Sequence, residues 1–211
     1  MGIWDFVSKV GTAVIEKALR DAERAQEKQQ EMQRAPTEPP QTSASYHHGR
    51  SDNRTAFVLS APGRSEKAAQ APLAGASGKT IHNVLERLNK CDPETFPSSD
   101  KTDYRTISAT DRVHYQSATG STEGKKSEIV SQKNLDRVRK GSDGIDTVVA
   151  YGKRAQDVVK ASGFQGKVIE SSHPSMQNLN RNISATGDTA AARADDRISK
   201  FSKVILKKSK S

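Results

Sequence analysis

Short apolar runs alternate with stretches of helical periodicity from Thr55 onward, and this alternation restricts the folds open to the chain. Four apolar runs have the length of strands, at 55–60, 104–110, 145–151 and 167–170. Apolar residues recur at helical spacing in 77–89, 129–140, 153–162 and a final segment that carries Ile198, Phe201, Val204 and Ile205. Strands that alternate with helices favour a parallel sheet covered on both faces. The sequence therefore predicts an α/β three-layer sandwich with a mainly parallel four-stranded central sheet.

The first 54 residues differ in composition and in the pattern of apolar residues from the rest of the chain. Ile3, Val7, Val10 and Val14 form the apolar stripe of an amphipathic helix, and a highly charged stretch follows. The segment 35–54 is rich in Pro, Ser and other polar residues, which is typical of a flexible linker. The predicted organisation is an amphipathic and charged helix at 1–34, a linker at 35–54, a globular domain at 55–206 and a basic tail at 207–211.

The charge is spread unevenly along the sequence. Residues 1–123 hold 16 basic and 16 acidic side chains, whereas residues 124–211 hold 18 basic and 9 acidic ones. A basic half indicates a polyanionic partner, nucleic acid first and an anionic membrane second, with a merely solubilising surface as the alternative. Cys91 is the only cysteine, which excludes an internal disulfide and a four-cysteine metal site. We expect a cytoplasmic monomer that holds no metal or other cofactor.

Two loops follow predicted strands and contain residues suited to a site. Ala61–Gly63 comes directly after the first strand, and Ser171–Ser175 comes after the fourth. In parallel sheets the ligand site lies at the carboxyl ends of the strands. These two loops are therefore expected to line one shared pocket.

The first of these loops carries a resemblance to a known family. The stretch 58–85, VLSAPGRSEKAAQAPLAGASGKTIHNVL, resembles the first motif of the iron–sulfur type of bacterial and archaeal uracil-DNA glycosylases. That motif consists of a strand, G-E-A-P-G, a polar loop, P-F-V-G, a small residue, a glycine and a helix. Ala61–Gly63 matches A-P-G, Pro72 and Gly75 match the P and the last G of P-F-V-G, and Gly78 opens the helix.

The second loop continues the resemblance. His173–Ser175 is similar to the H-P-S motif that follows the last strand in the uracil-DNA glycosylase superfamily, and 148–159 is similar to its strand–Gly–helix unit. The resemblance covers about residues 55–206 and keeps the motifs in the family's order. It implies a protein that binds DNA and cleaves the bond between a base and its sugar.

Several positions depart from the family's pattern. Ser60 stands in place of the acid of G-E-A-P-G, and Leu73 stands in place of the aromatic residue that stacks on uracil. The stretch 106–110, with Ser108, lacks the Asn that reads the uracil edge, and the four cluster cysteines are absent. Two of these changes remove bulk, so the pocket would suit a larger base, such as a modified pyrimidine of phage DNA.

The resemblance and the positions of the loops together predict the site residues. His173 is the candidate hydrogen-bond donor to the departing base, and Glu66 and Asp111 are candidates to position water. The expected base pocket consists of Ser60, Ala61, Pro62, Gly63, Leu73 and Ser108. The expected DNA contacts are Arg64, Ser65, Lys79, Ser175, Met176 as a wedge in the base stack, and Arg181, with further phosphate contacts from the terminal lysines.

The leading hypothesis is a DNA glycosylase that removes a modified, bulky pyrimidine by hydrolysis of the N-glycosidic bond, in defence against phage DNA. A second hypothesis is a member of the superfamily that binds DNA or a base without cleavage, because the motif acid is missing. A third is an adaptor in which residues 3–19 dock on a protein or a membrane surface. The same segment would alternatively pack on its own domain, and its charges argue against a membrane span.

Overall fold

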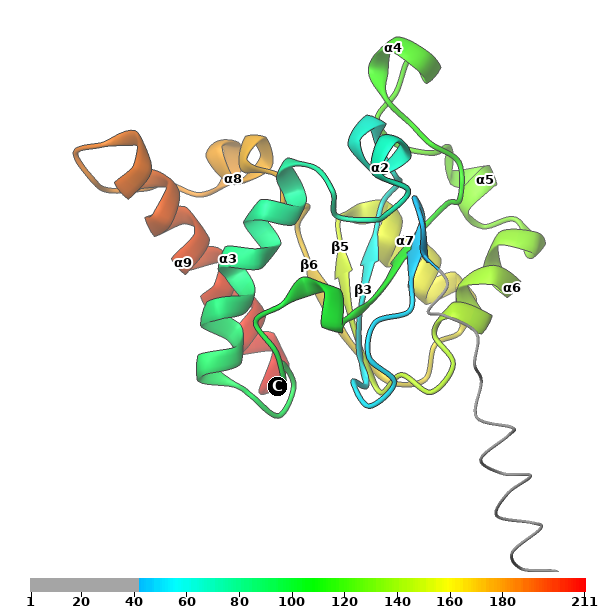
Figure 1. Ribbon diagram of the computed structural model, residues 1–211, viewed down its shortest axis with the longest axis horizontal. Coiled ribbons are helices and arrows are strands. Elements are labelled where there is room, and N and C mark those ends of the chain that lie inside the picture. The colour runs from blue at the N-terminus through cyan, green and yellow to red at the C-terminus, as the bar shows by residue number, and fades with distance from the viewer. Residues whose placement is uncertain (1–41) are drawn as a thin grey trace, which may run out of the picture. The chain divides into compact units, whose positions relative to one another are not determined.

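The computed structural model describes residues 42–211, which belong to one compact unit (Figure 1). The predicted helix at 1–34 and the first part of the predicted linker, 35–41, lie outside the described residues. Within residues 42–211 the α/β class is confirmed. The helices are α2 (Arg64–Ala69), α3 (Ala76–Cys91), α4 (Gln116–Thr119), α5 (Lys126–Ile129), α6 (Gln132–Gly141), α7 (Lys153–Ser162), α8 (Met176–Asn182) and α9 (Ala190–Ser209), with a 3-10 turn at Lys101–Asp103.

The centre of the sheet is parallel. Its strands are β3 (Thr55–Leu59), β4 (Arg105–Ser108), β5 (Thr147–Tyr151) and β6 (Lys167–Ser171), in the spatial order β4-β3-β5-β6. Val58 of β3 pairs with Ile107 of β4 on one side and with Ala150 of β5 on the other. Parallel strands with helical crossovers place all their carboxyl ends at one edge, so the loops after these strands meet there.

The prediction of four strands was wrong, because the sheet has six. A hairpin of β1 (Thr42–Ser43) and β2 (Tyr46–His47) adds two antiparallel strands to the outer edge of β4. Both strands fall inside the segment predicted as a linker. Strands of two residues carry no readable alternation, so only their pairing with β4 reveals them.

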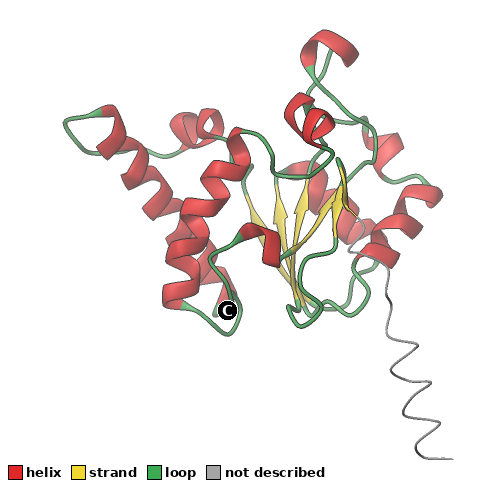
Figure 2. Cartoon of the chain, in the orientation of Figure 1, coloured by secondary structure: helices red, strands yellow, loops and turns green. Residues whose placement is uncertain are grey.

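Helices cover both faces of the sheet (Figure 2). On one face, Phe57, Val149 and Ile169 pack against α3, α8 and α9 in a core that also holds Leu85 and Phe201. The other face has its own apolar cluster, formed from Ala56, Val58, Val148, Ala150, Leu135 of α6 and Val158 of α7. Burying one such Leu, Ile or Phe side chain contributes about 1.5–3 kcal/mol. The alternating strand residues therefore supply two cores, one on each face.

Two predicted segments have different bounds in the structure. The helix predicted at 129–140 starts later, as α6 at Gln132, because Ser131 turns the chain after α5 and its hydroxyl donates to the Glu128 carbonyl oxygen (2.8 Å). The tail predicted from residue 207 is part of α9, which runs through Ser209. The hydroxyl of Ser209 donates to Asp92 Oδ2 (2.6 Å), and this contact fastens the end of α9 to the end of α3.

Candidate functional site

A cavity of about 480 Å³ opens at the edge of the sheet where the parallel strands end. We call it the larger cavity. Four loops contribute to it: the loop after β3, the loop between α2 and α3, the loop after β4, and the loop between β6 and α8. Nine of the predicted site residues line it, namely Ala61, Pro62, Gly63, Glu66, Leu73, Ser108, His173, Ser175 and Arg181. The expected convergence of the two motif loops on one pocket is therefore observed.

Glu66 lines the larger cavity but is engaged with the backbone. Its Oε2 accepts the N–H of Gly63 and its Oε1 accepts the N–H of Gly75, each at 3.0 Å. Hydrogen bonds from backbone N–H groups to a carboxylate are among the stronger ones in proteins. Glu66 thus joins the loop after β3 to the loop before α3. This geometry assigns it a positioning role, in place of the water-binding role expected from the sequence.

Leu73 adopts a backbone conformation that is rare for a residue with a side chain. Its φ of 56° lies in the left-handed region. Two residues lie close to its carbonyl oxygen. Lys101 Nζ donates a hydrogen bond to this oxygen (2.7 Å), and Gly78 is so near that a Cβ added to it would lie only 1.8 Å from the same oxygen. The side chain of Leu73 is buried at the wall of the larger cavity. Strained conformations of this kind are concentrated at functional sites.

His173 has a defined tautomer when its ring is neutral. Its Nδ1 accepts the backbone N–H of Ser175 (3.2 Å), so the proton of the neutral ring is on Nε2. Burial lowers the pKa of His173 below the ordinary 6.5, although the charges of Glu123 and Glu66 act in the opposite direction. No hydrogen bond from Nε2 to another group occurs within residues 42–211. The half-buried ring therefore offers an Nε2–H donor at the wall of the larger cavity.

The close approach of His173 to the first motif depends on Gly152. This residue follows β5 with a φ of 88°, and a Cβ on it would lie 3.2 Å from Ser60 Oγ and 3.6 Å from the Cβ of His173. Ser60 is buried behind the larger cavity and does not line it, and its hydroxyl has no hydrogen-bond partner in the described part of the chain. Ser60 is therefore beside His173 but outside the expected base pocket.

Glu123 is a cavity residue that the sequence analysis missed. It is between α4 and α5 in the segment that follows β4, lines the larger cavity, and is close enough to His173 for its charge to act on the ring's pKa. Its Oε2 lies 3.7 Å from Arg154 Nε, while neither oxygen accepts a backbone N–H from residues 42–211. The rule that loops after parallel strands line the site applies to the whole segment 111–125 and would have included Glu123.

His114 is a second missed residue of the same loop. Its backbone N–H donates to the Pro62 carbonyl oxygen (2.9 Å), which ties this loop to the first motif. Its Nε2 lies 3.3 Å from Glu128 Oε1, and its ring contributes to the wall of the larger cavity. Burial acts to raise the pKa of the Glu128 carboxyl, but hydrogen bonds from Thr110 and His114 outweigh it and hold this pKa below its ordinary value.

The residues predicted to contact DNA are divided between the cavity and its surroundings. Ser175 accepts the backbone N–H of Asn178 (3.2 Å) as the N-cap of α8, and Arg181 is an exposed residue of the cavity wall. Outside the wall, Arg64 is 5.1 Å from the ring centre of the cavity residue Tyr115, and Ser65 and Lys79 are exposed. Met176 packs against the apolar core, so the wedge role expected for it is not supported by its position.

Asp111 does not belong to the larger cavity. It lines a separate cavity of about 180 Å³, the smaller cavity, with Thr110, Glu128 and three residues of α6. The prediction that Asp111 shares a pocket with His173 was wrong. The reason is the direction of the chain after β4, which first passes the α6 side of the sheet and reaches the larger cavity only at His114.

Within residues 42–211, no group of three or more His, Cys, Asp and Glu side chains is arranged to hold a metal ion. Among the helices described in this part, none combines the length and apolar composition of a membrane span. Compared with models of known protein families and with curated protein sequences, the chain matches none of them. Its function is therefore inferred from the geometry of the larger cavity and from the motifs that line it.

Proposed function

We propose that the protein is a DNA glycosylase that hydrolyses the N-glycosidic bond of a modified pyrimidine. The observation that carries this proposal is the combination of a neutral His173 donor and the Glu123 carboxylate at one cavity. The motif residues Ala61–Gly63 and Leu73 line the same cavity. A donor and a carboxylate in a partly desolvated cleft are the two groups that this reaction requires.

The chemistry follows from the charges that develop during bond cleavage. The oxygen of water bonds to C1′ of the sugar while the C1′–N bond breaks, and the electron pair of that bond leaves with the base. The Nε2–H of His173 would donate to a carbonyl oxygen of the base as negative charge builds on it. The Glu123 carboxylate would face the sugar, where it stabilises positive charge and accepts the proton that water loses. The departing base is protonated in turn, so charge and atoms balance. Donors of this kind contribute about 10²–10³ in rate.

The size of the cavity favours a substrate larger than a plain pyrimidine. A volume of about 480 Å³ is within the range of about 300–1,000 Å³ found for small-molecule sites. Leu73 and Ser108 line the wall where the resembling family has a bulkier aromatic residue and an Asn, so they leave more room at two positions. A substituted base, such as a hydroxymethylated or glucosylated pyrimidine of phage DNA, is therefore the proposed substrate class.

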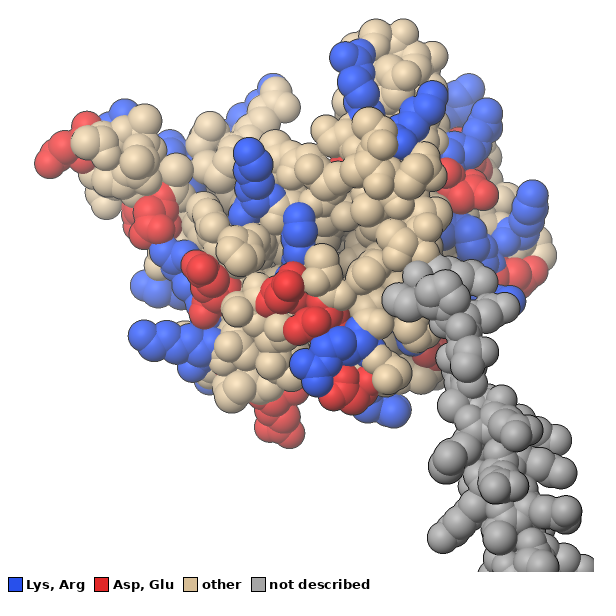
Figure 3. Space-filling view, viewed as in Figure 1, with Lys and Arg blue, Asp and Glu red and all other residues tan. Residues whose placement is uncertain are grey.

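A DNA strand is the partner that the surface favours. Lys and Arg side chains gather around α2, α4 and α5 in Figure 3, at the end of the molecule where the cavity opens. Arg64 on α2 and Lys125 and Lys126 at the start of α5 are exposed there. A base inside a duplex is out of reach of such a cavity, so the target nucleotide would be flipped out of the stack or lie in a single strand. Contacts from these cations to phosphates would position it.

Base release measured by mass spectrometry tests the proposal. The substrates are DNA with uracil, methylated, hydroxymethylated or glucosylated pyrimidines, and the proteins are the wild type and His173→Ala. We expect release of a substituted pyrimidine by the wild type and a rate lower by about 10²–10³ for His173→Ala, with DNA affinity within about threefold. Full activity of His173→Ala would contradict the mechanism.

Binding without cleavage is the second candidate function. The observation that favours it is Ser60, which supplies no charge where the resembling motif has an acid and whose hydroxyl lies behind the cavity. The same assay separates the two functions. A wild-type protein that binds DNA with a substituted base more tightly than unmodified DNA, yet releases no base, supports recognition alone.

A further inference from the structure

The smaller cavity lies on the α6 side of the end of β4, beside the larger one. Its volume of about 180 Å³ exceeds the roughly 30 Å³ that a water molecule occupies in the liquid, so it has room for a small ionic group. The two cavities share a wall. Ser108, Thr110 and the pair formed by His114 and Glu128 separate them, because Ser108 and His114 line one cavity and Thr110 and Glu128 line the other.

Arg137 of α6 brings a largely desolvated positive charge to the smaller cavity. Its Nη2 donates to the Ser108 carbonyl oxygen (2.6 Å), and its Nε and Nη2 donate to Asn134 Oδ1 (3.1 and 2.9 Å). No carboxylate lies within 4.0 Å of this guanidinium among residues 42–211, and its Nη1 has no acceptor there. Burial lowers the pKa of Arg137, while the more distant charge of Asp111 opposes this effect. Charges that are partly removed from water in proteins are ordinarily paired, so this half-buried one favours an anion.

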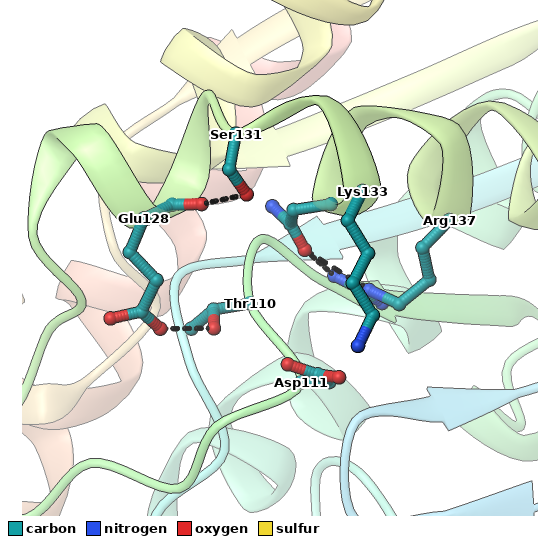
Figure 4. A pocket seen from close by; sticks show the side chains of 7 residues that line it. Thr110, Asp111, Glu128, Ser131, Lys133 and Arg137 are labelled. Atoms are coloured by element: carbon teal, nitrogen blue, oxygen red, sulfur yellow. Dashed lines mark hydrogen bonds between the residues drawn. The ribbon is translucent and has the colours of Figure 1, made fainter.

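Lys133 adds a second cation one turn before Arg137. Its side chain extends into the space between α6 and Asp111 in Figure 4, and its ammonium group has no ion pair or hydrogen bond in the described part of the chain. The N-terminus of α6 is at the same cavity, because its N-cap Ser131 lines it, and the Ser131 hydroxyl donates to Glu128 and does not cap the N–H groups of the first turn. A helix N-terminus adds further preference for negative charge.

The carboxylates of the smaller cavity do not form a competing cation site. Glu128 accepts hydrogen bonds from Thr110 and His114, and its second oxygen lies 3.9 Å from Arg112. Asp111 is exposed at the rim. Among residues 42–211, the charged groups that face the cavity without an ion pair are Lys133, Arg137 and the exposed Asp111, so positive charge exceeds negative charge there.

We infer that the smaller cavity binds a backbone phosphate of the DNA strand whose base enters the larger cavity. This inference rests on the proposed function. Arg137 holds the carbonyl of Ser108, a residue of the base cavity, so a phosphate bound at Arg137 would be in contact with the element that lines the base site. The phosphate would fix the register of the strand, and the larger cavity would select the base.

The test compares Lys133→Gln with Lys140→Gln in the full chain. Both lysines are exposed residues of α6, but Lys140 is in its last turn and does not line the cavity. We expect Lys133→Gln to weaken binding of a modified oligonucleotide about three- to tenfold and to reduce the salt dependence of log K by about one. Lys140→Gln should leave both quantities unchanged. Arg137→Gln, checked for a wild-type thermal transition, should act in the same direction as Lys133→Gln.

A neutral methylphosphonate moved along the oligonucleotide identifies the contacted phosphate. At one position the methylphosphonate should weaken binding by the wild type and abolish the difference in affinity between the wild type and Lys133→Gln. If Lys133→Gln binds every oligonucleotide as the wild type does, the phosphate site is wrong, even where His173→Ala still abolishes base release. Tight binding of inorganic phosphate that depends on Lys133, without any effect of Lys133→Gln on DNA, would assign the cavity to free phosphate and overturn the inference.

Discussion

The backbone N–H of Ser175 donates to Nδ1 of His173 across 3.2 Å, and Pro174 between them has no N–H to offer. The H-P-S sequence therefore supplies the donor to the imidazole from the serine that follows the proline. Asn178 supports the same turn, because its Nδ2 donates to the His173 carbonyl oxygen (2.8 Å) while its backbone N–H donates to Ser175 Oγ. These contacts fix both the ring's orientation and the nitrogen that carries its proton.

The lowered pKa of His173 predicts a dependence of stability on pH. The unfolded chain takes up a proton on this ring near pH 6.5, whereas the folded protein resists protonation until a lower pH because the ring is buried. The unfolded state then binds more protons, so the free energy of unfolding falls as pH falls below 6.5 and stops falling below the pKa of the folded state. Urea unfolding at about pH 5.5 and about pH 7.5 should show a smaller difference for His173→Gln than for the wild type. An equal difference would contradict the burial of this ring.

Gly152→Ala should damage both stability and activity. The position has a φ of 88°, and the new methyl group would crowd Ser60 Oγ at 3.2 Å and lie in contact with the Cβ of His173 at 3.6 Å. We expect a loss of about 1–3 kcal/mol in the free energy of unfolding and slower base release. Gly163→Ala is the matched control, since its φ is 73° but nothing lies within 4 Å of the added atom. Urea unfolding and base release of both variants check this, and equal rates for the two would exclude a steric effect on His173.

Glu66→Gln should lower stability. A Gln side chain retains one acceptor, so one of the two N–H groups of Gly63 and Gly75 would face an amide donor. The expected loss is about 1–3 kcal/mol in the free energy of unfolding. Glu86→Gln serves as control because Glu86 is exposed on α3 and only pairs with His82 at 3.9 Å. A Glu66→Gln protein as stable as the wild type would show that the two loops do not need this carboxylate.

Local patterns were sufficient to predict the parallel centre of the fold. In β3 and β5 nearly every residue is buried, and such continuous apolar runs are visible in a sequence without knowledge of their neighbours. The hairpin of β1 and β2 was not predictable, because two-residue strands exist only through their pairing with β4. The division between α5 and α6 depends on Asn134, whose amide donates to the carbonyl oxygens of Ala109 and Ile129, a contact set by tertiary structure.

The site was most predictable where a strand fixed its position. Ala61–Gly63 and His173 follow strands directly, so their place at the edge of the sheet was determined by topology. Glu123 and Asp111 are in a long polar segment that holds only the short helix α4, and the direction of the chain between them decides which cavity each reaches. The hydrogen bond between Glu66 and Gly63 could be predicted from the sequence. Gly63 is the N-cap of α2, and a Glu three residues after an N-cap commonly accepts the backbone N–H of the N-cap residue.

The terminal lysines should contribute little to DNA binding, contrary to the expectation from charge alone. Ser209 accepts a hydrogen bond from Lys167, the first residue of β6, so the end of α9 is at the amino edge of the sheet, opposite the larger cavity. Replacing Lys207, Lys208 and Lys210 together with Ala should leave the salt dependence of log K almost unchanged.

The control for this prediction is the pair Arg64→Ala, beside the larger cavity, and Arg181→Ala, in its wall. These substitutions should reduce the salt dependence of log K by about one each, because each removes a cation near the proposed strand. Fluorescence anisotropy with a labelled oligonucleotide at several salt concentrations measures all of these slopes. A flatter slope for the tail variant than for the arginine variants would place the DNA along α9.

Glu123→Gln should separate the carboxylate that takes part in the chemistry from those that do not. The substitution keeps the size of the side chain and removes the charge that faces His173 and the proposed sugar. We expect base release slower by about 10²-fold, since stabilisation of the cationic transition state and proton acceptance from water are both lost. DNA affinity should stay equal or rise, because a negative charge near phosphates is removed.

Asp111→Asn is the matched control for Glu123→Gln, because Asp111 lines only the smaller cavity. Its rate of base release under single-turnover conditions, with enzyme in excess and the oligonucleotide saturated, should equal that of the wild type. Saturation is needed because the loss of a charge at the smaller cavity is expected to change affinity and should not enter the measured rate. If Asp111→Asn released the base slowly and Glu123→Gln released it at the wild-type rate, the roles of the two carboxylates would be reversed. The water would then be held from the α6 side of β4. Slow release by Glu123→Gln alone, with its thermal transition unchanged, is the result that the geometry of the larger cavity predicts.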